Sequence, residues 1–179
     1  MKSHDDPARQ QRRGFAAPPL STEENAELQR AAGQNVRVLR VARDEDVIVV
    51  ASPEALAIRT GNGWHFRRWE TILYGGWRDG SDQLYWTLLD GTEEHVPLAQ
   101  PADMPFVFAD RLRASIITVR QVELPDDLGS IILAGRRPPT DLDAQIVWTV
   151  QPGPGTDLND ARVQEHAVAE MAKLRDEFE

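Results

Sequence analysis

Apolar and polar residues alternate along short segments between Val36 and Leu98, and turn-forming residues separate these segments. A run of short strands with turn signals every eight to twelve residues or so is typical of an antiparallel barrel or sandwich. The separators include Asp44-Glu45-Asp46, Gly61-Asn62-Gly63 and Asp90-Gly91, which tolerate tight or left-handed backbone. The pattern predicts strands over residues 36–42, 46–51, 55–60, 64–69, 71–78, 83–89 and 92–98.

Helical signals flank this series on both sides. Ser21-Thr22-Glu23-Glu24 has the form of a capping box, and Gly33 suits a helix C-terminus, so a short helix is expected within residues 21–35. Asp103 followed by Met104-Pro105 predicts a second helix over residues 103–115. Its apolar stripe is expected to contain Phe108, Leu112 and Ile116.

The C-terminal part predicts further strands and a final amphipathic helix. Strands are expected over residues 116–123, 130–135 and 144–150, before a break rich in proline and glycine at 151–155. Asp157 can cap a helix in which Val163, Ala167, Met171, Leu174 and Phe178 recur at helical spacing. We expect this stripe to pack on the extra strands; otherwise it is a surface for homodimerisation or for docking a partner.

Composition narrows the function. Of the 179 residues, 41% are hydrophobic, and the formal net charge is −9, which argues against binding to nucleic acid or to an anionic membrane surface. Cysteine is absent, so disulfides, thiolate catalysis and cysteine metal sites are excluded. Residues 1–20 are polar and contain three prolines, which predicts a disordered tail and no secretory signal. A cytoplasmic protein is expected, with residues 21–179 forming one α+β domain.

The Trp69-Glu70-Thr71-Ile72 step, the strand series and the helix after it resemble a bacterial pleckstrin-homology-like domain of the kind related to GRAM domains. This resemblance covers about residues 36–115 and implies a strongly bent antiparallel barrel, plugged by Trp69 and Ile72 and capped by the helix at 103–115. Residues 116–179 would form a strand-and-helix extension. It is similar to that of uncharacterised bacterial proteins that share an Arg-Arg-Pro step like Arg136-Arg137-Pro138.

The resemblance implies a binding scaffold and no chemistry. Family members that bind phosphoinositides use a basic cluster in the first loop between strands. In this chain that loop is Arg43-Asp44-Glu45-Asp46, which is mostly acidic. A protein or peptide partner is therefore favoured over a lipid head group, and binding of a lipid or small molecule in the barrel mouth is the alternative.

Two groups of residues are candidates for recognition. In the run Trp64-His65-Phe66-Arg67-Arg68-Trp69, a strand would direct Trp64, Phe66 and Arg68 to one face and His65, Arg67 and Trp69 to the other. Arginine beside tryptophan can hold an acidic peptide, although the same residues can simply belong to the barrel. Arg136 and Arg137, expected at a solvent-facing strand end, can bind an anion.

No enzyme signature is present. The sequence contains no phosphate-binding glycine loop and no Gly-x-Ser-x-Gly elbow. The four histidines lack the short spacing of metal ligands, so neither a metal nor another cofactor is expected. A catalytic site would need His65 and His95 to converge with Glu93 or Glu94. We therefore expect a non-enzymatic interaction module.

Overall fold

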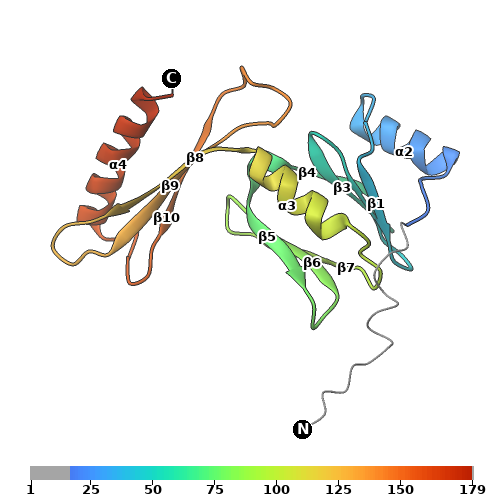
Figure 1. The fold of residues 1–179 in the computed structure, drawn as a ribbon, viewed down its shortest axis with the longest axis horizontal. Helices are drawn as coiled ribbons and strands as arrows, with labels where there is room; N and C mark the ends of the chain where they lie inside the picture. The colour runs from blue at the N-terminus through green and yellow to red at the C-terminus, as the bar shows by residue number, and fades with distance from the viewer. Residues whose placement is uncertain (1–16, 179) are drawn as a thin grey trace, which may run out of the picture. The chain divides into compact units, whose positions relative to one another are not determined.

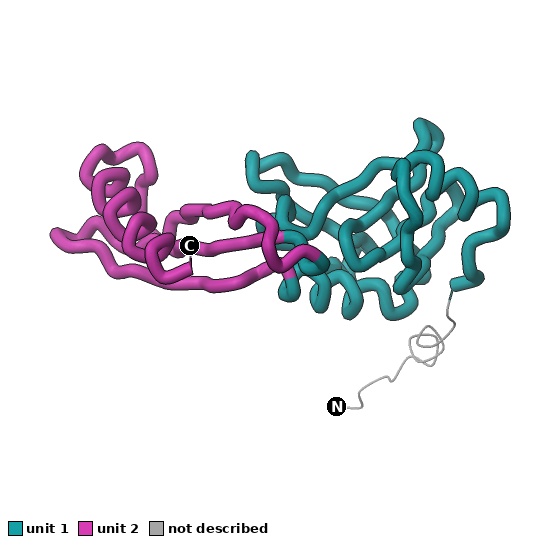
Figure 2. The backbone as a smooth tube through the Cα atoms, turned by 90° about the horizontal axis from the view of Figure 1, so that it is seen from above, with its two compact units in different colours: residues 1–114, 138–140 teal, residues 115–137, 141–179 magenta. Residues whose placement is uncertain are grey.

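The computed structural model describes residues 17–178 and contains helices together with antiparallel sheets, so the predicted α+β class is confirmed (Figure 1). Within these residues the chain forms three α-helices, a 3-10 turn and three separate sheets. It divides into two compact units (Figure 2). The first unit comprises the residues up to 114 together with residues 138–140, and the second unit comprises residues 115–137 and the residues from 141 onward. The predicted strand series, residues 36–98, lies entirely within the first unit.

The first unit contains two antiparallel sheets. In the four-stranded sheet, the strands pair in chain order: β1 (Arg40–Arg43), β2 (Ile48–Ala51), β3 (Ala55–Thr60) and β4 (Gly63–Arg68). After the 3-10 turn η1 (Trp69–Thr71), the three-stranded sheet follows: β5 (Ile72–Arg78), β6 (Gln83–Leu88) and β7 (Glu93–Pro97). All seven predicted strands are thus present.

The four-stranded sheet is covered on both faces. Its alternating side chains divide between two buried clusters, since Val49, Ala51 and Leu56 contribute to one and Val50 and Ala57 to the other. The first cluster is the main core, which also takes side chains from the second sheet and from helix α3 (Met104–Ala114). The second cluster is closed by helix α2 (Thr22–Ala32). Period-two alternation along each strand produces this division.

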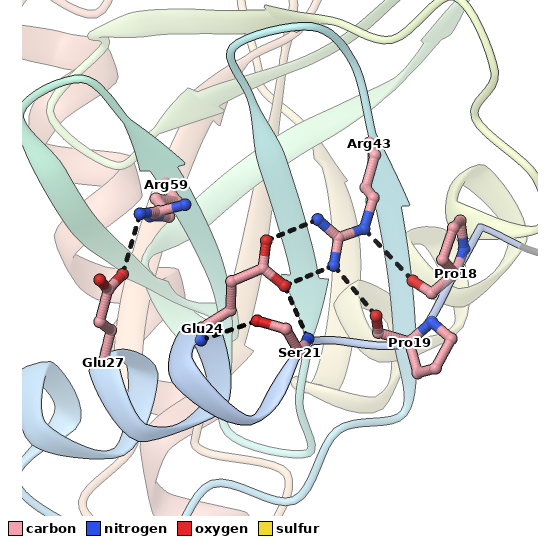
Figure 3. A network of polar contacts seen from close by, with 7 residues as sticks. All are labelled: Pro18, Pro19, Ser21, Glu24, Glu27, Arg43 and Arg59. Carbon is pink, nitrogen blue, oxygen red and sulfur yellow. Dashed lines mark hydrogen bonds and ion pairs between the residues drawn. The ribbon is translucent and has the colours of Figure 1, made fainter.

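Helix α2 is held by polar contacts around one buried leucine, Leu28. The predicted capping box is confirmed, because the Glu24 backbone N–H donates to the Ser21 hydroxyl and the Ser21 N–H donates to the Glu24 carboxylate. Arg43 on β1 donates to both oxygens of the same carboxylate, at 2.8 and 2.7 Å (Figure 3). This arginine also donates to the carbonyl oxygens of Pro18 and Pro19. The chain is therefore fixed from Pro18 onward, whereas the first sixteen positions of the predicted tail lie outside the described residues.

Helix α3 packs against the second sheet through a glycine. The register shift between β5 and β6 lies between Ile72 and Tyr74, away from Gly75. Gly75 instead permits close approach, because a Cβ there would lie 2.8 Å from Cζ of Phe108 and 2.5 Å from a backbone oxygen of β6. Phe108 also meets Trp69 edge to face, with ring centroids 5.6 Å apart. Trp69 and Phe108 are both fully buried in the main core, so the inward position predicted for Phe108 is confirmed.

A closed barrel is not found among residues 17–178. The ladder is interrupted at η1, where three residues turn between β4 and β5, so the seven strands form two sheets. The segment after β7 returns to β1 through an isolated bridge between Arg43 and Gln100, and the Ala99 N–H donates to the Asp44 carboxylate at 2.7 Å. The sheets are thus linked at this corner without a continuous ladder.

The second unit is a three-stranded antiparallel sheet with one helix. Strand β9 (Ser130–Arg136) lies between β8 (Ile116–Glu123) and β10 (Val147–Pro152). Helix α4 (Ala161–Asp176) packs on one face of this sheet, with the predicted residues Val163, Ala167, Met171 and Leu174 buried against it. Four of the five predicted stripe residues are therefore buried within the unit, while the fifth, Phe178, is 42% exposed.

Two boundary predictions in this part are wrong. Helix α4 is capped by Asp160, whose side chain accepts from the Arg162 N–H. Asp157 instead accepts from the Asn159 N–H in a local turn before the helix. Ile116, predicted to extend the stripe of the second helix, begins β8 because α3 ends at Ala114.

No helix within residues 17–178 combines the length and the apolar character needed to cross a membrane.

Candidate functional site

An open hollow of about 330 Å³ lies where the two sheets of the first unit face each other. Its lining comes from both sheets: Ile58, His65, Arg67, Trp86, Glu93, Glu94, His95 and Val96. Strand β4 is an edge strand of the four-stranded sheet, and β7 is an edge strand of the three-stranded sheet. The hollow is therefore bordered by two edge strands, each of which has a neighbouring strand on only one side in its sheet. Sheet edges of this kind carry backbone groups that an extended segment can pair with.

The inner wall of the hollow is apolar. Ile58 from β3, Trp86 from β6 and Val96 from β7 are all buried and belong to the main core cluster. They are therefore fixed by the packing behind them. A ligand group that enters the hollow would meet a preformed apolar surface, which lowers the ordering cost of binding.

A charged pair crosses the hollow from one sheet to the other. Arg67 on β4 donates through Nε to Oε2 of Glu94 on β7 at 2.6 Å, and its Nη2 donates to Oε1 of the same carboxylate. The indole N–H of Trp86 donates to Glu94 Oε2, also at 2.6 Å. One carboxylate thus accepts three hydrogen bonds, and the bidentate geometry with Arg67 fixes its orientation.

These contacts determine the charge states of the pair. The hydrogen bond from Arg67 lowers the pKa of Glu94 against the opposing effect of desolvation, and the bond from Trp86 lowers it further. The hydrogen bond to Glu94 likewise raises the pKa of Arg67. A carboxyl group that serves as a general acid near neutral pH needs its pKa raised, not lowered. The geometry therefore suits a fixed pair of opposite charges, and it does not suit Glu94 as a general acid near neutral pH.

The rim of the hollow is exposed and polar. His65 on β4 and both Glu93 and His95 on β7 are exposed to solvent while lining the hollow. The two histidines considered for catalysis thus belong to one site. Within the described part of the chain, however, no group of three histidine, cysteine or acidic residues is arranged to hold a metal ion.

The predicted division of the β4 side chains is observed, and it splits the candidate residues. His65 and Arg67 line the hollow, whereas Trp64 and Phe66 pack on the opposite face against the cluster beneath α2. Arg68 lies outside the hollow, where its Nε pairs with the buried carboxylate of Glu70 at 2.6 Å. Of the four candidates on this strand, two belong to the site.

Arg136 and Arg137 lie in the second unit and line no part of the hollow. Arg136 was expected to face solvent, but it is buried, and burial lowers the pKa of its guanidinium. Its Nη1 donates to the hydroxyl of Ser115, at 3.3 Å. Arg137 donates its backbone N–H to the Ser115 carbonyl and Nη1 to the Leu142 carbonyl at 2.6 Å. Both arginines therefore hold the start of β8 and the loop that follows β9.

From the sequence, Glu94 is expected only as a partner of the histidines. A signal for Glu94 was present in β7, because the apolar Val96 and Leu98 fix which face points inward, and Glu94 shares that face. A carboxylate at an inward position requires a partner. Arg67, at an inward position of β4, is the side chain that supplies it.

Comparison with known proteins gives no match to a protein-family model, to a curated protein or to a solved structure.

Proposed function

We propose that this chain is a non-enzymatic binding module whose ligand is an extended segment of a protein, seated in the hollow between β4 and β7. The observation that carries the proposal is the hollow itself, which combines a rigid apolar wall with the Arg67–Glu94 pair and two bordering strand edges. An extended peptide can pair its backbone with one such edge while a side chain enters the hollow. Small pockets beside an exposed strand provide specificity in this mode of recognition.

We further propose that the first unit is a pleckstrin-homology-like domain. Four antiparallel strands, then three more, then a helix that packs on both sheets support this assignment. The bridge between Arg43 and Gln100, which brings the two sheets together at one corner, supports it further. Domains of this kind serve mainly as scaffolds for binding, as the sequence resemblance implied.

A lipid in the hollow is less compatible with its lining. The volume of about 330 Å³ is at the lower end of the range for small-molecule sites. Arg67, Glu93 and Glu94 carry charges along the hollow, and an acyl chain would desolvate them without replacing their hydrogen bonds. Binding of a lipid in place of a peptide would be a direct contradiction of the proposal.

The test is selection of random peptides displayed on phage against the purified full-length chain. His65→Trp places a bulky ring at the exposed mouth of the hollow, and Asn62→Trp places the same ring in the neighbouring turn, outside the lining. Selected peptides should bind the parent chain and the Asn62→Trp variant alike, and should lose at least tenfold in affinity, about 1.4 kcal/mol, for the His65→Trp variant. Equal binding to both variants, or enrichment of no peptide, would refute this site.

A further inference from the structure

The charge around the hollow is unbalanced. Glu93 and Glu94 line it, and Asp90, in the turn between β6 and β7, is near enough to Arg67 and Glu94 to influence the pKa of both. The residues at and beside the hollow thus carry three carboxylates and one guanidinium, that of Arg67. The Glu94 carboxylate is shared between Arg67 and the Trp86 indole, whereas Glu93 lies exposed at the rim.

This arrangement is complementary to a long basic side chain. The aliphatic stem of arginine or lysine can lie along the apolar wall made by Ile58, Trp86 and Val96, while its charged end reaches the carboxylates at the rim. Long basic side chains bury their methylene groups and keep the charge beside polar partners. An acidic side chain or a phosphate group in the same place would meet repulsion from the surplus carboxylates.

We propose, resting on the peptide-binding function above, that the hollow receives an arginine or lysine side chain of the bound segment. The partner is then a protein with a basic residue in an exposed, extended segment. The formal charge of −9 on the whole chain favours the approach of such a partner, because attraction between opposite net charges raises association rates. Glu93 provides the free carboxylate, and the Arg67–Glu94 pair holds the wall of the site in place.

The experiment uses three synthetic peptides that differ at one central position. The parent probe is an acetylated and amidated pentapeptide with two threonines, two valines and a central arginine. In the second probe citrulline replaces arginine, which keeps the shape and removes the charge, and in the third probe glutamate replaces it. Binding to the full-length chain is measured by amide chemical-shift titration at low salt.

The arginine probe should bind about fivefold more tightly than the citrulline probe, which is the scale of one partly exposed charge contact. The glutamate probe should bind more weakly than both. Glu93→Gln should remove most of the preference for arginine, whereas Glu165→Gln, the same change on the exposed side of α4, should leave the preference intact. Added salt should reduce the preference, since screening weakens exposed charge contacts.

The outcomes separate this inference from the proposal beneath it. If citrulline and arginine probes bind equally and His65→Trp weakens both, the hollow binds peptides but does not select for a basic side chain. If the glutamate probe binds most tightly, Arg67 and the histidines form an anion site and the charge argument is wrong. If all three probes leave the β4 and β7 resonances unchanged, both this inference and the proposed function fail.

Discussion

Replacing Glu24 with glutamine removes one charge from the contact that joins α2 to β1 and leaves the shape of that contact nearly unchanged. The hydrogen bond from Arg43 and that from the Ser21 backbone lower the pKa of Glu24 from its ordinary 4.5 to about 2. At 1.36 kcal/mol per pKa unit this difference corresponds to about 3 kcal/mol. The two side chains keep 19% and 23% of their surface exposed, so solvent screening reduces the effect, and we expect a loss of about 1–2 kcal/mol.

Glutamine preserves the capping interaction, because it accepts the Ser21 N–H in the same position of a capping box. The loss therefore reports on the ion pair with Arg43. Glu23→Gln is the matched control, because Glu23 is exposed and lies in the same first turn of α2. Both substitutions remove one negative charge from this turn, so any loss of interaction with the helix dipole is the same in the two variants. Urea unfolding at pH 7, followed by circular dichroism, gives the free energy of unfolding for each variant.

The difference between the parent chain and Glu24→Gln should depend on pH. Because the folded-state pKa of Glu24 is lowered, its contribution is fully present above the unfolded value near 4.5 and is lost as the pH falls toward about 2. The gap between the two unfolding free energies should therefore narrow below pH 4.5. A gap equal to that of the Glu23 control, or one that does not change between pH 6 and pH 3, would refute the assigned role of the Arg43 contact.

Three further changes test other parts of the packing. Gly75→Ala should lower the free energy of unfolding by about 1–3 kcal/mol in urea, because the new Cβ would press on Phe108 and on β6. The control Gly80→Ala should be tolerated, because a Cβ at Gly80 would have nothing within 4 Å. Equal stability of the two variants would contradict the close approach at Gly75. Leu174→Ala should lower the free energy of unfolding by about 2–5 kcal/mol, because Leu174 is fully buried. The control Val168→Ala, at a residue 71% exposed on the same helix, should change this free energy by less than about 0.5 kcal/mol. Similar losses in the two variants would show that α4 does not pack as described. Arg120→Gln breaks an exposed pair with Glu177 and should leave the thermal midpoint unchanged, and a clear drop would reveal a stronger contact.

Local patterns predicted the strands well. Strand β3 occupies the predicted residues 55–60, and the alternation in β4 divides Trp64 and Phe66 from His65 and Arg67 as expected. Both results depend on side-chain periodicity, which a single strand contains in full. The capping box at Ser21 and Glu24 is equally local, since its two hydrogen bonds join residues three positions apart.

Features that depend on distant parts of the chain were not predicted. The register shift near Ile72 depends on how β5 pairs with β6, and no residue of β5 alone encodes it. The Arg67–Glu94 contact joins residues 27 positions apart in different sheets. Arg136 resembles an exposed strand-end arginine in sequence, but the folded chain buries it.

The most direct test of the central claim is a titration of the full-length chain with a phage-selected peptide, followed through the indole N–H signals in proton–nitrogen correlation spectra. The Trp86 indole donates to Glu94 in the wall of the hollow, and Trp86→Phe identifies its signal among those of the five tryptophans. Binding in the hollow should shift this signal together with the amides of β4 and β7. Shifts confined to Trp148 and strands β8–β10, with the Trp86 signal unmoved, would contradict the account.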